Sequence, residues 1–275
     1  MLRMQVPNES ARPSRRAVLA PAVSVITLGG FSIRVHGEPL ALGRKTPAKP
    51  LALLKLLAAQ GAHALSDTQV TDALWPDKGS TAPSCLAVNL HRLRRLLGAP
   101  EALVHRDRQV ALDSRWVWCD AIACEALLDQ AARCAHGAQR MQLTRRALAL
   151  YGGDFLAGEP GAGWIGTART HLRARYVRGC AALAERLAAD GRWEQALSFY
   201  QRGIDADELA ENLCLGLMAC CRALHRPLAG RDAYQRFARA LAAQSGAQPA
   251  PAMRALYDQL SRQRPVRNAS TASPS

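Results

Sequence analysis

The sequence predicts a mainly helical protein, in which a small α+β domain with short strands precedes an all-helical repeat domain. The chain has 275 residues, which is enough for two ordinary domains. Alanine, leucine and arginine dominate and are strong helix formers, whereas aromatic residues make up 5% of the chain. Strand-like alternation occurs before about residue 113, and from about residue 120 the apolar residues follow a helical period.

The first domain is expected over residues 24–113. It begins with three short strands, at 25–28, 31–35 and 39–42. Three helices follow, at about 47–59, 66–74 and 82–97. A β-hairpin closes the domain, with strands at 103–105 and 110–112.

Local signals set the ends of these helices. Ser66 and Gln69 fit a capping box, in which the Ser hydroxyl and the Gln amide each satisfy an orphan backbone donor. Gly61 and Gly98 follow the first and third helices, where a left-handed residue commonly ends a helix. Three strands, three helices and a hairpin are the order of a winged helix-turn-helix domain. A small α+β domain of no set function is the alternative.

The second domain is expected over residues 118–262 and is helical throughout. Its helices are predicted at 121–134, 139–151, 167–189, 193–204, 208–224, 230–243 and 252–261. Identical residues recur at an offset of 34, such as Cys180 with Cys214 and Tyr200 with Tyr234. A period of 34 is that of tetratricopeptide (TPR) helix pairs, which stack and present a surface to partners. Chance matches between helices rich in alanine and leucine are the alternative.

The two ends of the chain are interpreted as disordered tails, over 1–23 and 263–275, because they are polar or basic and lack periodicity. Arg15-Arg16 and the apolar residues after it resemble an export signal, but Pro21 interrupts the run. No run of about 18 apolar residues predicts a membrane span. We therefore expect a cytoplasmic protein with no membrane partner.

The formal net charge of +14 indicates a polyanionic partner such as nucleic acid. Arginine enrichment in a genome rich in G and C is the alternative. The eight cysteines form no CxxC pair and have no histidines at zinc-finger spacing, so reduced core thiols are expected. No Ser/His/Asp or paired-carboxylate pattern stands out. The sequence therefore predicts no enzyme, no metal and no cofactor.

The third helix of the first domain carries the main candidate site. Leu86, Leu90, Leu93 and Leu97 form an apolar stripe for the core. The opposite side carries the residues that could read bases or touch phosphates, namely Cys85, Val88, Asn89, Arg92, Arg94 and Arg95. Arg92 is expected to matter most, since positions 85, 88, 89 and 92 share helical steps of three and four. A solvated arginine-rich face is the alternative.

Two further basic groups flank this helix. Arg106 and Arg108 lie on the tip of the hairpin at 105–110, from which an arginine can enter the minor groove. Arg44 and Lys45 precede the first helix and could contact phosphates. An ordinary charged turn or loop is the alternative for each group.

Several stretches resemble the SARP-type bacterial regulators. Leu28-Gly29-Gly30-Phe31 and residues 88–98 are similar to parts of that family's winged helix. Ala147–Leu156 and Gly191–Tyr200 are similar to its bacterial transcriptional activator domain (BTAD), so that the resemblance covers about residues 24–262.

The resemblance implies sequence-specific binding of double-stranded DNA by the third helix and the wing, a homodimer on direct repeats, and recruitment of RNA polymerase. The positions that correspond to family DNA contacts are Cys85, Val88, Asn89, Arg92, Arg94 and Arg106 or Arg108. Cys85 and Ala87 replace the more polar groups usual there, which leaves the base preference open. The functional interpretation is a transcription regulator, an activator by resemblance. The alternative is a TPR-type interaction adaptor whose winged helix does not bind DNA.

Overall fold

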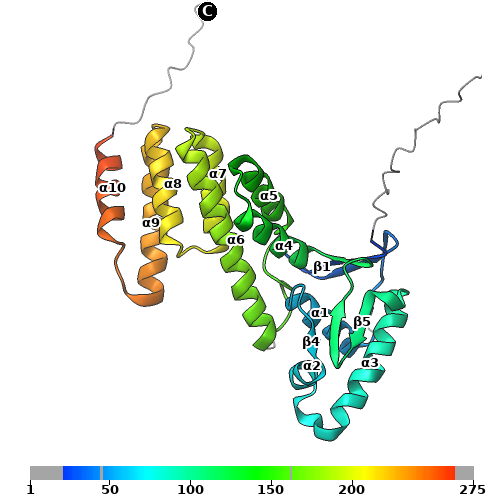
Figure 1. Cartoon of the computed structure of the whole chain (residues 1–275). Coiled ribbons are helices and arrows are strands. Elements are labelled where there is room, and N and C mark those ends of the chain that lie inside the picture. Colours follow the sequence, from blue (N-terminus) through cyan, green and yellow to red (C-terminus); the bar gives the residue numbers. More distant parts are fainter. Residues whose placement is uncertain (1–20, 44–45, 162, 264–275) are drawn as a thin grey trace, which may run out of the picture.

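The computed structural model describes residues 21–43, 46–161 and 163–263. Its architecture confirms the predicted class, a mainly helical protein with a small N-terminal sheet region followed by a helical domain (Figure 1). The strands are β1 (Val23–Ile26), β2 (Ser32–Val35), β3 (Glu38–Pro39), β4 (Leu65–Ser66), β5 (Leu103–Arg106), β6 (Gln109–Leu112) and β7 (Val117–Cys119).

The helices follow the predicted order closely. They are α1 (Ala48–Ala59), α2 (Asp67–Leu74), α3 (Ala82–Leu97), α4 (Asp120–Arg133), α5 (Gly137–Leu150), α6 (Gly163–Ala189), α7 (Trp193–Ala206), α8 (Glu211–Ala223), α9 (Pro227–Ser245) and α10 (Pro251–Arg262). Short segments of 3-10 helix lie at Pro76–Thr81, which is kinked at Gly79, and at Pro100–Ala102. Each helix predicted in the second domain is present, with ends shifted by at most four residues.

The strands form two small sheets. One has the order β3-β2-β1-β7 and the other the order β4-β6-β5. β7 runs parallel to β1, with Val23 opposite Val117, and so brings the chain back beside its first strand before α4 begins. The strand expected at 39–42 ends at Pro39, and the sequence predictions did not include β4 or β7.

The three helices of the first domain pack through the predicted leucine stripe. Leu86, Leu90, Leu93 and Leu97 of α3 are each at most 2% exposed. The capping box at the start of α2 is present, because Gln69 N donates to Ser66 Oγ at 3.2 Å and Ser66 N donates to Gln69 Oε1 at 2.9 Å.

The 34-residue repeat extends from side chains to the backbone. α7 begins at Trp193 and α9 begins 34 residues later at Pro227. The turns before them share one hydrogen bond, from Arg192 N to Leu187 O at 2.9 Å and from Arg226 N to Cys221 O at 2.8 Å. The successive helices α6 to α10 lie side by side in Figure 1, as expected for stacked helix pairs.

A buried carboxylate joins the N-terminal sheet to the helical domain. Asp120, the first residue of α4, is 3% exposed. Its Oδ1 accepts hydrogen bonds from Thr27 N at 2.8 Å and Thr27 Oγ1 at 2.7 Å, and its Oδ2 accepts one from Leu28 N at 2.9 Å. These bonds fix the end of β1 against the start of the helical domain.

The backbone at Leu28 and Gly29 also contacts the loop between α5 and α6 directly. Gly29 N donates to Asp154 O at 3.0 Å, and Leu28 pairs with Phe155 in an isolated β-bridge. Gly29 has a φ of +91°, and a Cβ there would lie 2.7 Å from Gly152 O. Only glycine fits this close approach, so the two domains meet backbone to backbone.

The apolar core runs through this junction. Val25 and Leu28 of the first domain belong to the same buried cluster as Phe155, Leu156 and Leu172 of the helical domain. A second cluster fills the helix pairs from α6 to α10. All eight cysteines are free thiols, and burial raises the pKa of Cys119 and of Cys214 to about 12. Within the described ranges, no helix is long and apolar enough to cross a membrane.

Replacing Asp120 by alanine should destabilise the whole chain. The change leaves three buried donors of Thr27 and Leu28 without a partner, and we expect the free energy of unfolding to fall by about 3 kcal/mol. Urea denaturation followed by circular dichroism measures this loss. Asp258→Ala on the exposed surface of α10 is the matched control and should change stability by less than about 0.5 kcal/mol. Equal stability of the two variants would contradict the importance of the junction.

Candidate nucleic-acid interface

One face of α3 is open to solvent. It carries Ala87, Val88, His91, Arg92 and Arg95, all of them exposed, and Cys85 lies half-buried at its edge. Val88 is 48% exposed, which is unusual for a large apolar side chain in this domain. The face therefore combines apolar contact area with two exposed guanidinium groups, those of Arg92 and Arg95.

Asn89 does not lie on this face, contrary to the position expected from the spacing. It is 7% exposed, and its Nδ2 donates to Cys85 O, one turn back, at 2.7 Å. Its Oδ1 has no hydrogen-bond partner within the described part of the chain. The reason is helical geometry, because Asn89 lies three residues after Leu86 and directly before Leu90, on the side of the leucine stripe.

Arg94 is also turned towards the protein. Its Nη2 donates to Leu103 O, the first residue of β5, at 3.1 Å, and the side chain is half-buried. Arg94 thus ties the C-terminal half of α3 to the hairpin. Its guanidinium positions the wing relative to the helix.

The hairpin formed by β5 and β6 has a two-residue turn. Arg106 pairs with Gln109, and the turn residues Asp107 and Arg108 have φ values of 49° and 57°. Left-handed conformation at both positions is the type I′ turn that fits the twist of a β-hairpin. Arg106 and Arg108 are exposed on either side of the tip.

The hairpin of β5 and β6 is braced against β4 and the start of α2. β6 pairs with β4, and Asp67 N at the start of α2 donates to Arg108 O at 2.9 Å. His105 Nε2 lies 2.9 Å from Asp67 Oδ1. The tip is therefore held in a fixed position relative to α2.

The site residues predicted from the sequence fall into three groups. Cys85, Val88, Arg92, Arg95, Arg106 and Arg108 reach solvent on α3 and the wing, whereas Asn89 and Arg94 contact the protein. Arg44 and Lys45 lie outside the described residues. The sequence predictions did not include Lys78, which is exposed in the segment between α2 and α3 and could have been noticed as a basic residue in that turn.

The exposed arginines of this surface have unneutralised charge. Among the residues that the structure describes, none of Arg92, Arg95 and Arg106 forms an ion pair, nor does Arg108. An exposed helix face beside a fixed basic hairpin suits a polyanion with grooves, since the free guanidinium groups can replace counterions on phosphates. Within the same ranges, no group of three His, Cys, Asp or Glu side chains could hold a metal ion.

Comparisons with known proteins agree with the resemblance seen in the sequence. The family described as the bacterial transcriptional activator domain matches residues 119–261, slightly more than half of the chain. The structure is similar to that of Mycobacterium tuberculosis EmbR in complex with a low-affinity phosphopeptide. The TM-score is 0.68 at 22% sequence identity, over 90% of this chain and 67% of that chain. No curated protein sequence matches the chain.

Two glycine substitutions in the wing should change stability in opposite directions. Arg108 occupies a left-handed position that costs a non-glycine residue about 1 kcal/mol, so Arg108→Gly should raise the free energy of unfolding by about 0.5–1 kcal/mol. Arg106 is extended in β5, so Arg106→Gly should lower it by a similar amount. Thermal melts of both variants measure the difference. Destabilisation by both substitutions to the same extent would contradict the turn geometry.

Proposed function

Because the chain belongs to the bacterial transcriptional activator domain family and is a SARP-type transcription regulator, we propose that it binds duplex DNA in a sequence-specific manner through α3 and the wing. The observation that carries the proposal is the exposed face of α3 beside a braced hairpin, both with arginines that form no ion pair within the described part of the chain. In this proposal residues 24–113 form the DNA-binding domain and residues 118–262 form the BTAD.

The exposed residues of α3 divide by chemistry. Arg92 is proposed to bond a guanine edge or clamp a phosphate, because it lies in the middle of the exposed face. Val88 and Cys85 offer apolar contact suited to a thymine methyl group. Arg95 lies nearer the helix end and suits the phosphate backbone. Asn89 and Arg94 support this face from the protein side.

The wing and the loop before α1 supply the remaining contacts. Arg106 and Arg108 are proposed to reach the minor groove or the backbone beside the α3 site. Arg44 and Lys45 are proposed as phosphate contacts on sequence grounds alone. In this proposal α3 recognises the DNA sequence, and the flanking arginines and lysine contribute the part of the affinity that depends on salt.

The helical domain is proposed to act through protein contacts and to carry no catalysis. Stacked helix pairs present continuous surfaces, which suits contacts with RNA polymerase or with a second copy on direct repeats of the operator. A protein that activates transcription in this way acts at the chromosome, in the bacterial cytoplasm.

Selection from a random duplex pool by the purified full chain tests the proposed function. We expect one enriched motif, and an affinity for it that falls steeply as salt rises, because each phosphate contact releases a counterion. A folded protein with no preferred sequence at low salt would contradict DNA reading. That result would favour an adaptor whose winged helix makes protein contacts.

Arg92→Ala is the sharpest test within the site. If Arg92 reads a guanine, the change should cost about 1–3 kcal/mol of binding free energy and relax preference at one base position. If it clamps a phosphate, affinity should fall equally for all sequences and the salt slope should fall by about one unit. Arg239→Ala, an exposed arginine on α9, is the control with the same change of charge. An Arg92→Ala protein that binds as tightly as this control at every salt concentration would remove α3 from the interface.

A further inference from the structure

A groove of about 900 Å³ lies on the helical domain, next to the junction with the N-terminal sheet. The loop between α5 and α6 forms one side of it together with α6. The end of α7, the loop after it and the last turns of α9 form the other side. Its charged lining residues are Asp154, Arg173, Arg202, Asp205, Asp207 and Glu208.

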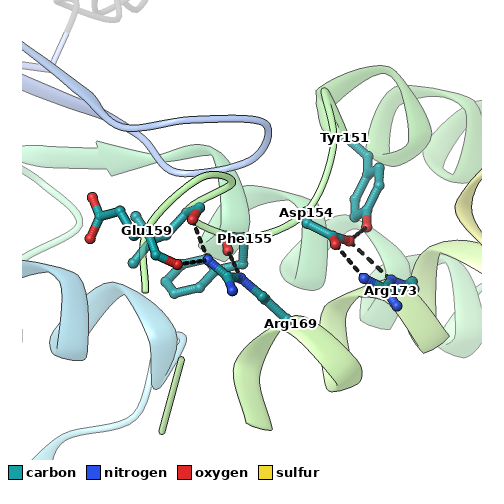
Figure 2. A network of polar contacts seen from close by, with 7 residues as sticks. Tyr151, Asp154, Phe155, Glu159, Arg169 and Arg173 are labelled. Atoms are coloured by element: carbon teal, nitrogen blue, oxygen red, sulfur yellow. Dashed lines mark hydrogen bonds and ion pairs between the residues drawn. The ribbon is translucent and has the colours of Figure 1, made fainter. Parts of the chain in front are cut away.

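The positive side chains of the groove are already engaged. Arg173 pairs with the carboxylate of Asp154, which also accepts the Tyr151 hydroxyl at 3.1 Å (Figure 2). The Arg173 guanidinium holds the pKa of the Asp154 carboxyl below its usual range, so this pair is neutral as a unit. Arg202 Nη2 donates to Leu148 O at 2.8 Å. On the α6 side the charge of Arg173 is therefore neutralised, whereas Arg202 lies on α7 and its hydrogen bond to a carbonyl leaves its positive charge in place.

The opposite side carries three exposed acids, Asp205, Asp207 and Glu208. Asp205 and Asp207 each accept a hydrogen bond from a neutral donor, the Gln201 amide at 2.8 Å and Leu209 N at 3.1 Å. Within the described ranges, none of the three acids forms an ion pair. Their negative charge is therefore available to a ligand.

Two helix ends add to this negative potential. α7 ends at Ala206 and α9 ends at Ser245, and residues of both last turns line the groove. The C-terminus of a helix carries a partial negative charge on its free carbonyls. Arg236 lines a neighbouring hollow beside Asp205 and makes no ion pair with it. The wall at the end of α7 thus carries three acids against one arginine, Arg202, in a chain whose net charge is +14.

We propose that this groove binds a segment of a partner protein that is rich in arginine and lysine. The proposal rests on the proposed role of the helical domain in protein contacts, and it names the chemistry of the partner. Cationic side chains complement the exposed acids Asp205, Asp207 and Glu208. The bound segment lies against Asp154, whose backbone carbonyl holds Gly29 of the N-terminal sheet.

Fluorescence anisotropy with a labelled basic peptide tests the proposal on the full chain. The probe is a fluorescein-labelled peptide of about twelve residues that alternates arginine and alanine, and its counterpart has glutamate in place of arginine. We expect the wild-type protein to bind the basic peptide and not the acidic one at about 50 mM salt, where exposed charges are weakly screened. Asp205→Asn combined with Glu208→Gln should weaken binding about three- to tenfold.

The matched control is Asp232→Asn combined with Asp258→Asn, which changes the net charge equally at exposed acids outside the groove. It should bind the peptide as the wild type does. Gln244→Arg places a cation in the groove at an exposed position and should also weaken binding, which gives a second test if the double variant folds poorly.

Two results would overturn the groove assignment. One is a wild-type protein that does not bind the basic peptide at low salt. The other is equal affinity of the groove variant and the control variant, which would mean that attraction to the overall surface accounts for binding. Measuring the affinity of the same proteins for the operator DNA distinguishes failure of the groove proposal from failure of the proposed DNA binding. If the wild-type protein binds its operator but not the basic peptide, the groove assignment alone is wrong. If it binds the basic peptide in the groove but prefers no DNA sequence, the proposed DNA binding alone is wrong.

Discussion

The contact between the end of β1 and the helical domain determines how every other part of the molecule is placed. The carboxylate of Asp120 is buried, which costs free energy unless its oxygens accept hydrogen bonds. The donors of these hydrogen bonds come from Thr27 and Leu28. The same two residues directly follow the first strand, before the turn at Gly29. Satisfying Asp120 therefore requires the N-terminal sheet to lie directly on the first helix of the BTAD.

Further interactions around this contact reinforce it from several directions. The Arg169 side chain of α6 donates to three carbonyls, those of Phe155, Leu156 and Glu159, and so fixes the loop that receives Gly29 (Figure 2). Lys55 of α1 reaches the carboxylate of Glu159 at 2.5 Å. Because apolar residues from both domains share one core, the exposed face of α3 and the groove on the helical domain keep a fixed spatial relation. Under the two proposals made above, a partner held in that groove stands at a set distance from bound DNA.

The sequence predicts what depends on local signals. Helical periodicity, the Ser66 capping box and the 34-residue repeat each involve residues close in the chain, and the structure has all of them. β4 and β7 were missed because strands of two or three residues show no alternation and their partners lie far away in the sequence. The contacts of Asp120 join residues more than ninety positions apart, so no local pattern reveals them. The exposure of Arg92 and Arg108 could be predicted, and the helical spacing of Asn89 from Leu86 also contained its inward position, which the expected site missed.

We expect the junction to make the two domains one cooperative unit. Differential scanning calorimetry of the full chain, with Gly29→Ala as the comparison, tests it most directly. We predict one transition for the wild type, with equal calorimetric and van't Hoff enthalpies. For Gly29→Ala, whose new Cβ meets Gly152 O, we predict two separate transitions. Two transitions in the wild type, or a variant that melts as one unit at the wild-type temperature, would contradict the claim.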